Sequence, residues 1–258
     1  MNLIDVKDLS NWLDNLLKIS MFEDYSPNGL QVEGKAKIAR IITGVSASEA
    51  LLKCAIKKCA DAILVHHGWF WKNENPCIKG IKKTRLNLVL KHDINIFAYH
   101  LPLDAHPLLG NNAQLANILD ITPFLDEKNK PITYGYKSLI WTGSLQKSKT
   151  LQELGNDIEK RLNRSPLIIG KPEKIIQSIA WCTGAAQNMF QDAINKNFDA
   201  FLTGEISEHN VHLARETNTG FISAGHHATE RFGIQALGTK IAQEFGIEVE
   251  FIDIDNPV

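Results

Sequence analysis

Cysteine is scarce in this sequence, and none of its four cysteines forms a Cys-x-x-Cys pair. Cys54 and Cys59 are five residues apart in a predicted helix, so they do not stack on one face as ligands three or four residues apart would. No paired-cysteine motif is therefore present. We expect reduced, mostly structural thiols and a cytoplasmic location.

An excess of positive charge is also missing. The formal net charge is −1, so composition suggests no binding to nucleic acid phosphates or to an anionic membrane surface. Long apolar runs are absent from the first segment, MNLIDVKDLSNWLDNLL, which carries Asp5, Asp8 and Asp14. This segment is neither a secretory signal nor a membrane span, and its pattern predicts an amphipathic helix.

Two common catalytic signatures are missing as well, the Gly-x-Ser-x-Gly nucleophile turn and the phosphate-binding loop. What the chain does contain is 44% hydrophobic residues, 22% charged residues and 17 scattered glycines. That profile is typical of a globular α/β protein.

Strand and helix patterns alternate along the first part of the chain. The expected order is strand 38–45, helix 49–60, strand 60–65, helix 80–93 and strand 94–100. Ser46 and Glu49 form a capping-box pattern before the first of these helices. The following segment, LPLDAHP, is expected to be a loop because Pro102 disfavours a helix. Such alternation predicts a mainly parallel sheet covered by helices.

A polar, Pro-containing stretch at residues 121–136 is the expected linker between two halves, residues 1–120 and 137–258. The second half repeats the alternation. Strands are expected at 136–143, 175–184, 198–204, 219–225 and 247–254. Helices are expected at 150–162 and 208–217, with one more passing through 189–197 and a last one passing through 234–246. Thr150 and Glu153 form a second capping box. Residues 42–68 align by eye with residues 181–205, which indicates a weak internal duplication.

Ionisable side chains follow four of the predicted strands. These are His66 and His67; His100 and Asp104; Glu205 and His209; and His226, His227 and Glu230. Ligands of parallel α/β sheets bind beyond the carboxyl ends of the strands. Imidazole and carboxylate are the ligands that zinc, iron and manganese accept.

The sequence spacing within two of these pairs determines whether both members can bind the same metal ion. Successive strand residues point to opposite faces, so His66 and His67 share one centre only if the strand has ended and the chain turns at Gly68. Otherwise each faces a different neighbour. His226 and Glu230 are four apart in the expected first turn of the last helix, so both project the same way.

Each of these residues also has a simpler interpretation in which it binds no metal. A single histidine at a strand end is more often a satisfied core or surface residue, and Glu230 alone suits a helix start. We interpret His92 and His106 as solvated or structural, His212 as a packing residue, and the run Trp69 to Trp71 as a pocket wall or an interface. Because several ligand-type groups converge on strand ends, a metal site is the leading interpretation.

Six segments in order, SPNGLQVEG, ILVHHG, YHLPLD, LTGE, AGHHATERFG and FIDIDNPV, resemble the Nif-three-like proteins, also called GTP cyclohydrolase I type 2 homologues. The chain is similar to the short bacterial members, which lack an inserted middle domain. The resemblance implies two similar three-layer α/β halves with mainly parallel or mixed sheets and two divalent metal ions between them. It assigns the metal ligands to His66, His67, His100, Asp104, His226 and Glu230. It also implies a ring-like homohexamer.

Two functions follow from this resemblance. The first is a metal-dependent hydrolase of the cyclohydrolase type, acting on a nucleotide or a cyclic amide or amidine, with Glu205 either as general acid/base or as a residue that orients a ligand histidine. The second is a non-catalytic, metal-dependent scaffold or metal-handling protein. Nucleic-acid binding has the least support. The ligand set suits zinc, iron or manganese and does not distinguish them.

Overall fold

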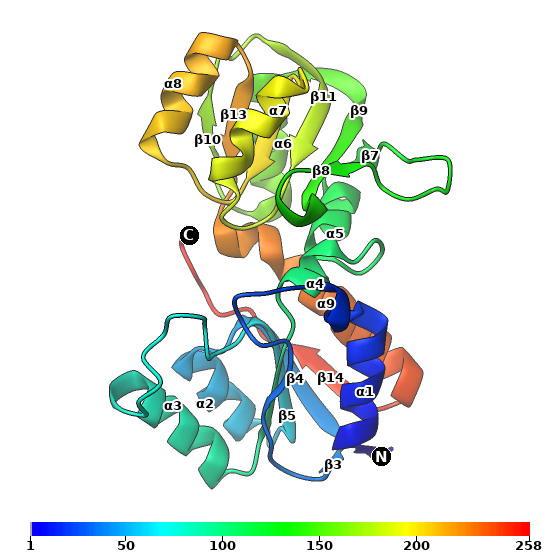
Figure 1. The fold of residues 1–258 in the computed structure, drawn as a ribbon, viewed down its shortest axis with the longest axis vertical. Helices are drawn as coiled ribbons and strands as arrows, with labels where there is room; N and C mark the ends of the chain where they lie inside the picture. The colour runs from blue at the N-terminus through cyan, green and yellow to red at the C-terminus, as the bar shows by residue number, and fades with distance from the viewer. Residues whose placement is uncertain (1) are drawn as a thin grey trace. The chain divides into compact units, whose positions relative to one another are not determined.

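The computed structural model describes residues 2–258 as an α/β protein (Figure 1). Its contacts divide the chain into two compact units. The first contains the residues up to Gly110 together with Gly233–Asp255, and the second contains Asn111–Phe232 and Asn256–Val258. Within residues 2–258, no helix combines the length and apolar character needed to cross a membrane.

The first unit is built on a five-stranded sheet with the order β14-β4-β5-β6-β2. The strands are β14 (Glu248–Phe251), β4 (Arg40–Ser46), β5 (Ala62–His67), β6 (Asn95–Ala98) and β2 (Gly29–Val32). The first four are parallel, and β2 runs antiparallel to β6. A separate antiparallel pair joins β1 (Ile4–Asp5) to β3 (Lys37–Ile38).

Helices cover both faces of this sheet. They are α1 (Val6–Leu17), α2 (Glu49–Lys57), α3 (Gly80–Lys91), α4 (Leu101–Ala105) and the later part of α9 (His226–Phe245), with a 3-10 turn η1 (Ile19–Met21) after α1. Neighbouring strand residues serve opposite faces: Ile41 packs with α1 and α9, whereas Ile42 packs with α2. The sheet is therefore the middle of three layers, with α2 and α3 drawn on one side and α1 on the other (Figure 1).

The second unit contains a seven-stranded sheet with the order β10-β13-β12-β11-β9-β7, and β8 pairs with β9. The strands are β7 (Ile121–Pro123), β8 (Thr133–Tyr134), β9 (Ile140–Thr150), β10 (Leu167–Ile169), β11 (Ile175–Trp181), β12 (Ala200–Thr203) and β13 (Gly220–Ser223). Its helices are α5 (Asn111–Ile118), α6 (Leu151–Leu162), α7 (Phe190–Asn195), α8 (Glu208–Thr217) and the first part of α9, with 3-10 turns η2 (Tyr136–Ser138) and η3 (Gln187–Met189).

This second sheet is also covered on both faces. Apolar residues of α5 and α6 pack on one face with Trp141 and Trp181. On the other face Phe190 of α7 contacts Phe201 and Phe221, with ring centroids 5.8 and 4.9 Å away. The predicted mixed α/β architecture is thus confirmed in each unit.

The weak internal duplication seen in the sequence has a structural counterpart. In each unit three consecutive parallel strands are followed by an antiparallel fourth, β4-β5-β6-β2 in the first and β11-β12-β13-β10 in the second. The aspartates that align in the duplication, Asp61 and Asp199, also make the same kind of hydrogen bond to the backbone. Asp61 accepts hydrogen bonds from the N–H groups of Ala39 and Arg40, and Asp199 accepts them from Gln177 and Ser178.

Some local expectations differ from the structure. Residues 121–136, expected as a linker, contain β7 and β8, whose backbones pair with β9 inside the second unit. The capping box at Ser46 was wrong: Ser48 caps α2 and accepts from the N–H of Leu51, while Ser46 still belongs to β4. The capping box of Thr150 and Glu153 is confirmed.

Candidate metal centre

His66 and His67 are the last two residues of β5, a strand that lies between β4 and β6. The prediction that the strand must end before two adjacent histidines can meet was wrong, because both residues still belong to β5. Their ring centroids are nevertheless only 4.5 Å apart. His66 is completely buried and His67 partly buried.

His100 joins these two residues from the loop after β6. Its ring centroid lies 5.1 Å from that of His66 and 5.7 Å from that of His67. Each of the three residues offers a nitrogen, and these atoms lie within 4.8 Å of one another. The parallel register of β5 and β6 places both carboxyl ends at one edge of the sheet, which explains the convergence.

The Nδ1 atom of every histidine in this group has a partner. The Nδ1–H of His66 donates to the backbone oxygen of Tyr99 at 2.9 Å, and the Nδ1 of His100 lies 2.9 Å from Asp24 Oδ1. The Nδ1 of His67 contacts the Ser46 hydroxyl at 3.1 Å. An Nδ1–H that donates to a carbonyl or carboxylate fixes the tautomer and presents Nε2 to a metal, which is the usual arrangement of ligand histidines.

Asp104 is the fourth predicted ligand of the first unit. Its Oδ1 lies 3.5 Å from the Nε2 of His66, and its carboxylate is buried. The residue lies on α4, so the expectation of a loop was wrong. Pro102 falls in the first turn of this one-turn helix, where a residue without an N–H removes no helical hydrogen bond.

Asp24 contacts the candidate site, and sequence reasoning missed it. Besides His100, its carboxylate accepts from the N–H of Leu101 at 3.0 Å and from the side chain of Asn28 at 3.0 Å. Burial alone would raise the pKa of Asp24, but the hydrogen bond and electrostatic interaction with His100, together with hydrogen bonds from Asn28 and Leu101, outweigh it and lower the pKa to about 2. The only sequence signal was its position two residues before SPNGLQVEG, which gave no link to His100.

The residues of the aromatic run Trp69 to Trp71 differ in how deeply they are buried. Trp69 is a core residue, 7% exposed, and its indole N–H donates to the oxygen of Ala47. The Trp71 ring lies edge-on to His100 with centroids 5.2 Å apart, and the Tyr25 ring lies edge-on to the same histidine at 5.1 Å. Of the aromatic run, Trp71 therefore lies beside the histidine group, together with a tyrosine from another loop.

The second unit holds the remaining predicted ligands at the start of α9. His226 is the first residue of this helix, and its Nε2 lies 3.1 Å from Glu230 Oε2, one turn later. The Nδ1 of His226 lies 2.7 Å from Glu205 Oε1. Burial alone would lower the pKa of His226, but the carboxylates of Glu230 and Glu205 outweigh burial and raise the pKa to about 9. The two carboxylates therefore stabilise positive charge on the His226 ring, with Glu205 at Nδ1 and Glu230 at Nε2.

Gly184 packs directly against this pair. Its φ is +68°, and a Cβ at this position would clash with Glu230 Oε1 and lie 3.2 Å from His226 Nε2. Only glycine combines this conformation with so close an approach. Gly184, the glycine of the Thr-Gly in the internal duplication, therefore lies directly against the site in this unit.

The other histidines lie apart from these ligand groups. His212 is exposed and paired with Glu208 at 2.7 Å, so its interpretation as a packing residue was wrong. His92 follows the last residue of α3, and His106 accepts from the N–H groups of Leu108 and Leu109, both consistent with structural roles. Among residues 2–258, the groups able to hold a metal include neither His209 nor His227.

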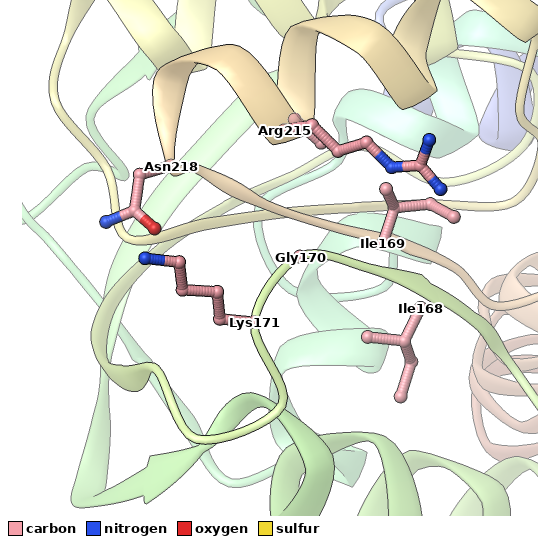
Figure 2. Close-up of a pocket in the computed structure, with 7 residues that line it drawn as sticks. Ile168, Ile169, Gly170, Lys171, Arg215 and Asn218 are labelled. Atoms are coloured by element: carbon pink, nitrogen blue, oxygen red, sulfur yellow. The ribbon is translucent and has the colours of Figure 1, made fainter.

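A separate pocket of about 300 Å³ lies in the second unit between β10 and α8 (Figure 2). Lys171, Arg215 and Asn218 lie around it with Ile168 and Ile169. Ile169 pairs with Phe221 in antiparallel register, so this pocket is at the amino end of β13. Glu205 and His226 follow the carboxyl ends of β12 and β13, at the opposite end of the sheet.

The sequence is similar to known proteins over nearly its whole length. The sequence profile described as Duf34/NIF3 (NGG1p interacting factor 3) matches residues 4–257. The chain belongs to the Duf34/NIF3 family. A Neisseria meningitidis serogroup A relative named "GTP cyclohydrolase 1 type 2 homolog" is 52% identical over 251 residues, covering 97% of this chain and 98% of the relative. A Haemophilus influenzae relative of the same name is 51% identical with the same coverage of each chain.

Solved structures with the same fold also match this chain. The structure titled as protein ybgI of unknown function matches with a TM-score of 0.92 and 46% identity, covering 99% of this chain and 100% of that one. A Thermus thermophilus protein matches with a TM-score of 0.86 and 30% identity over the same shares. The family resemblance inferred from six short segments is confirmed.

Proposed function

We propose that this Duf34/NIF3 protein is a metal-dependent hydrolase of the cyclohydrolase type that acts on a nucleotide or a cyclic amide or amidine. One observation carries the proposal: three clustered histidines each have Nδ1 engaged, which suits metal binding through Nε2. The name of the curated relatives, GTP cyclohydrolase 1 type 2 homolog, supports the reaction class.

The proposed ligands are the residues assigned by the family resemblance. They are His66, His67, His100 and Asp104 of the first unit and His226 and Glu230 of the second. We propose that they bind one pair of divalent ions, zinc, iron or manganese. The donor set fits such ions, because it combines imidazole nitrogens with carboxylate oxygens and contains no cysteine.

A bound pair of ions would supply Lewis acidity and lower the pKa of a bound water. Hydrogen-bond partners of the ligand histidines keep their rings in place. Asp24 and the backbone oxygen of Tyr99 orient His100 and His66, and Glu205 orients His226. Glu205 is about one-third exposed and is also our candidate general acid/base.

Elemental analysis of protein purified without a histidine tag tests the metal site. We expect two equivalents of metal per chain after supplementation, and less than one equivalent would contradict the proposal. Glu230→Gln preserves size and helix propensity but removes an anionic ligand, so affinity should fall by at least about 10–100-fold. If Glu230→Gln bound metal as tightly as the parent while His226→Ala did not, Glu230 would be only a helix-start acid.

Catalysis is tested by incubating metal-loaded and metal-stripped protein with pools of nucleotides and cyclic amides. We expect product only with the loaded protein, and a loss of at least tenfold in rate for Glu205→Gln if this residue transfers a proton. A Glu205→Gln protein that keeps full rate but binds metal less tightly would make Glu205 an orienting residue. Two equivalents of metal with no turnover would instead favour a metal-dependent scaffold or metal-handling protein.

We also propose an oligomeric state and a cellular location for the protein. The family resemblance leads us to propose a homohexamer, and light scattering should then give a particle about six times the 28.8 kDa chain mass. A 28.8 kDa particle at micromolar concentration would contradict it. All four cysteines are free thiols, which fits the proposed cytoplasmic location.

A further inference from the structure

Two aromatic rings stand beside the histidine group of the first unit. Tyr25 and Trp71 have ring centroids 6.0 Å apart and an interplanar angle of 32°. Both rings are edge-on to His100, at 69° and 84°. The centroid of Trp71 is also 6.1 Å from that of His67. The two rings therefore form one wall next to two of the proposed metal ligands.

Backbone hydrogen bonds hold this wall in place. The N–H of Lys72 donates to the oxygen of Tyr25 at 2.7 Å, which ties together the two loops that carry the rings. The N–H of Tyr25 donates to Asp24, the carboxylate that also orients His100. The wall and the histidine group thus share one set of loop contacts.

Exposure distinguishes this wall from ordinary core packing. Tyr25 is 45% exposed, and Trp71 is partly exposed, whereas neighbouring Trp69 is only 7% exposed. An exposed tyrosine and tryptophan fixed beside a polar centre offer a flat apolar surface to a ligand, at little further cost in side-chain entropy.

We propose that Tyr25 and Trp71 form a stacking subsite for the nucleobase of a nucleotide whose reacting group faces His67 and His100. This inference rests on the proposed hydrolase function and names its substrate class. Every base has a flat π-face that stacks on aromatic side chains, so the subsite selects a planar ring and not one particular base. The sugar and phosphate add nothing to this contact.

Calorimetric titration of metal-loaded protein with guanosine monophosphate and with ribose 5-phosphate tests the subsite. Loss of one stacking side chain should weaken nucleotide binding roughly 5- to 150-fold. We expect that loss for Trp71→Leu and Tyr25→Leu, near-parental affinity for Trp71→Phe, and unchanged ribose 5-phosphate binding. Tyr136→Leu, which removes a tyrosine 53% exposed in the second unit, is the matched control.

Two results would overturn the subsite: equal binding of the two ligands by the parent, or full nucleotide affinity in Trp71→Leu and Tyr25→Leu. Metal content measured on each variant separates this inference from the proposed function. If Trp71→Leu loses metal together with nucleotide, the ring supports the histidines and the subsite is wrong, while the metal site stands. If the parent holds no metal, the hydrolase proposal fails, and the same titrations still show whether the rings bind the base.

Discussion

At the scale of single residues, the hydrogen bond at Nδ1 decides what each histidine can do. Asp24 is the clearest case, because one buried carboxylate serves His100 and four backbone or side-chain donors nearby. We predict that Asp24→Ala weakens metal binding about 10–100-fold without unfolding the protein, and that Asp24→Asn has a smaller effect because it still offers one acceptor. Chelator competition measures the affinity.

Glu244→Gln is the control for Asp24, since it removes an exposed carboxylate that pairs with Lys240. Parental metal affinity in Asp24→Ala would show that His100 needs no orienting partner. Circular dichroism on each variant separates lost affinity from lost folding.

Gly184 gives a second prediction at this scale. Gly184→Ala places a methyl group against Glu230 Oε1 and forces an L-residue to φ +68°. We expect the carboxylate to be displaced and metal affinity to fall at least tenfold. Gly80→Ala is the matched control, because Gly80 also has a positive φ, at +58°, but nothing within 4 Å of the added methyl. Equal metal affinity in the two variants would mean that the Glu230 position is unimportant.

The six proposed ligands could be chosen from sequence because each belongs to a short segment at a strand or helix end. Asp24 could not, since 76 residues separate it from His100 and only the fold brings them together. The arrangement of His66 and His67 was also beyond sequence reasoning. Regular alternation predicts opposite directions for adjacent strand residues, yet the centroids of these two rings lie 4.5 Å apart.

At the scale of elements, most strands and helices followed from hydrophobic periodicity, because each sheet is buried between two layers of helices. The errors came from local chemistry. Pro102 was interpreted as a helix breaker, yet in a first turn it is tolerated. Ser46 fitted a capping box, but strand pairing opposite His67 extends β4 through Ser46, and Ser48 caps the helix instead.

Asp61 and Asp199 support a prediction about pH at this scale. Burial raises the pKa of each, but hydrogen bonds outweigh it and lower both below the ordinary value of 3.8. A lowered folded pKa gives stability that is present above about pH 4 and is lost as the pH falls through that folded pKa. Asp61→Asn should therefore cost about 1–3 kcal/mol at pH 7 and less near pH 3. Urea unfolding at both pH values measures this.

The control for the pH prediction is again Glu244→Gln, whose exposed ion pair contributes at most about 0.5 kcal/mol. A loss in Asp61→Asn that is the same at both pH values would show that the charge of Asp61 is irrelevant. The hydrogen bonds would then act only as neutral contacts at the start of β4.

At the scale of the whole molecule, the chain crosses between its two units after Gly110, after Phe232 within α9, and after Asp255. The proposed ligands are divided between the units, with four in the first and two in the second. If these ligands bind metal as proposed, metal binding and the stability of each unit are linked, and unfolding experiments can report on both.

Metal should raise the thermal stability of the protein, because the ligand geometry exists only in the folded chain. Free metal at 100 times its dissociation constant adds about 2.7 kcal/mol, which for a chain of this size raises the melting temperature by roughly 5–10 °C. Calorimetry before and after chelation measures the shift. If all six ligands bind the same ions, metal stabilises both units and every unfolding transition moves upward, whereas His100→Ala and Glu230→Gln each reduce the whole shift. If Glu230→Gln left the shift intact, the ligands of the first unit alone would hold the metal, and the proposed six-ligand site would be wrong.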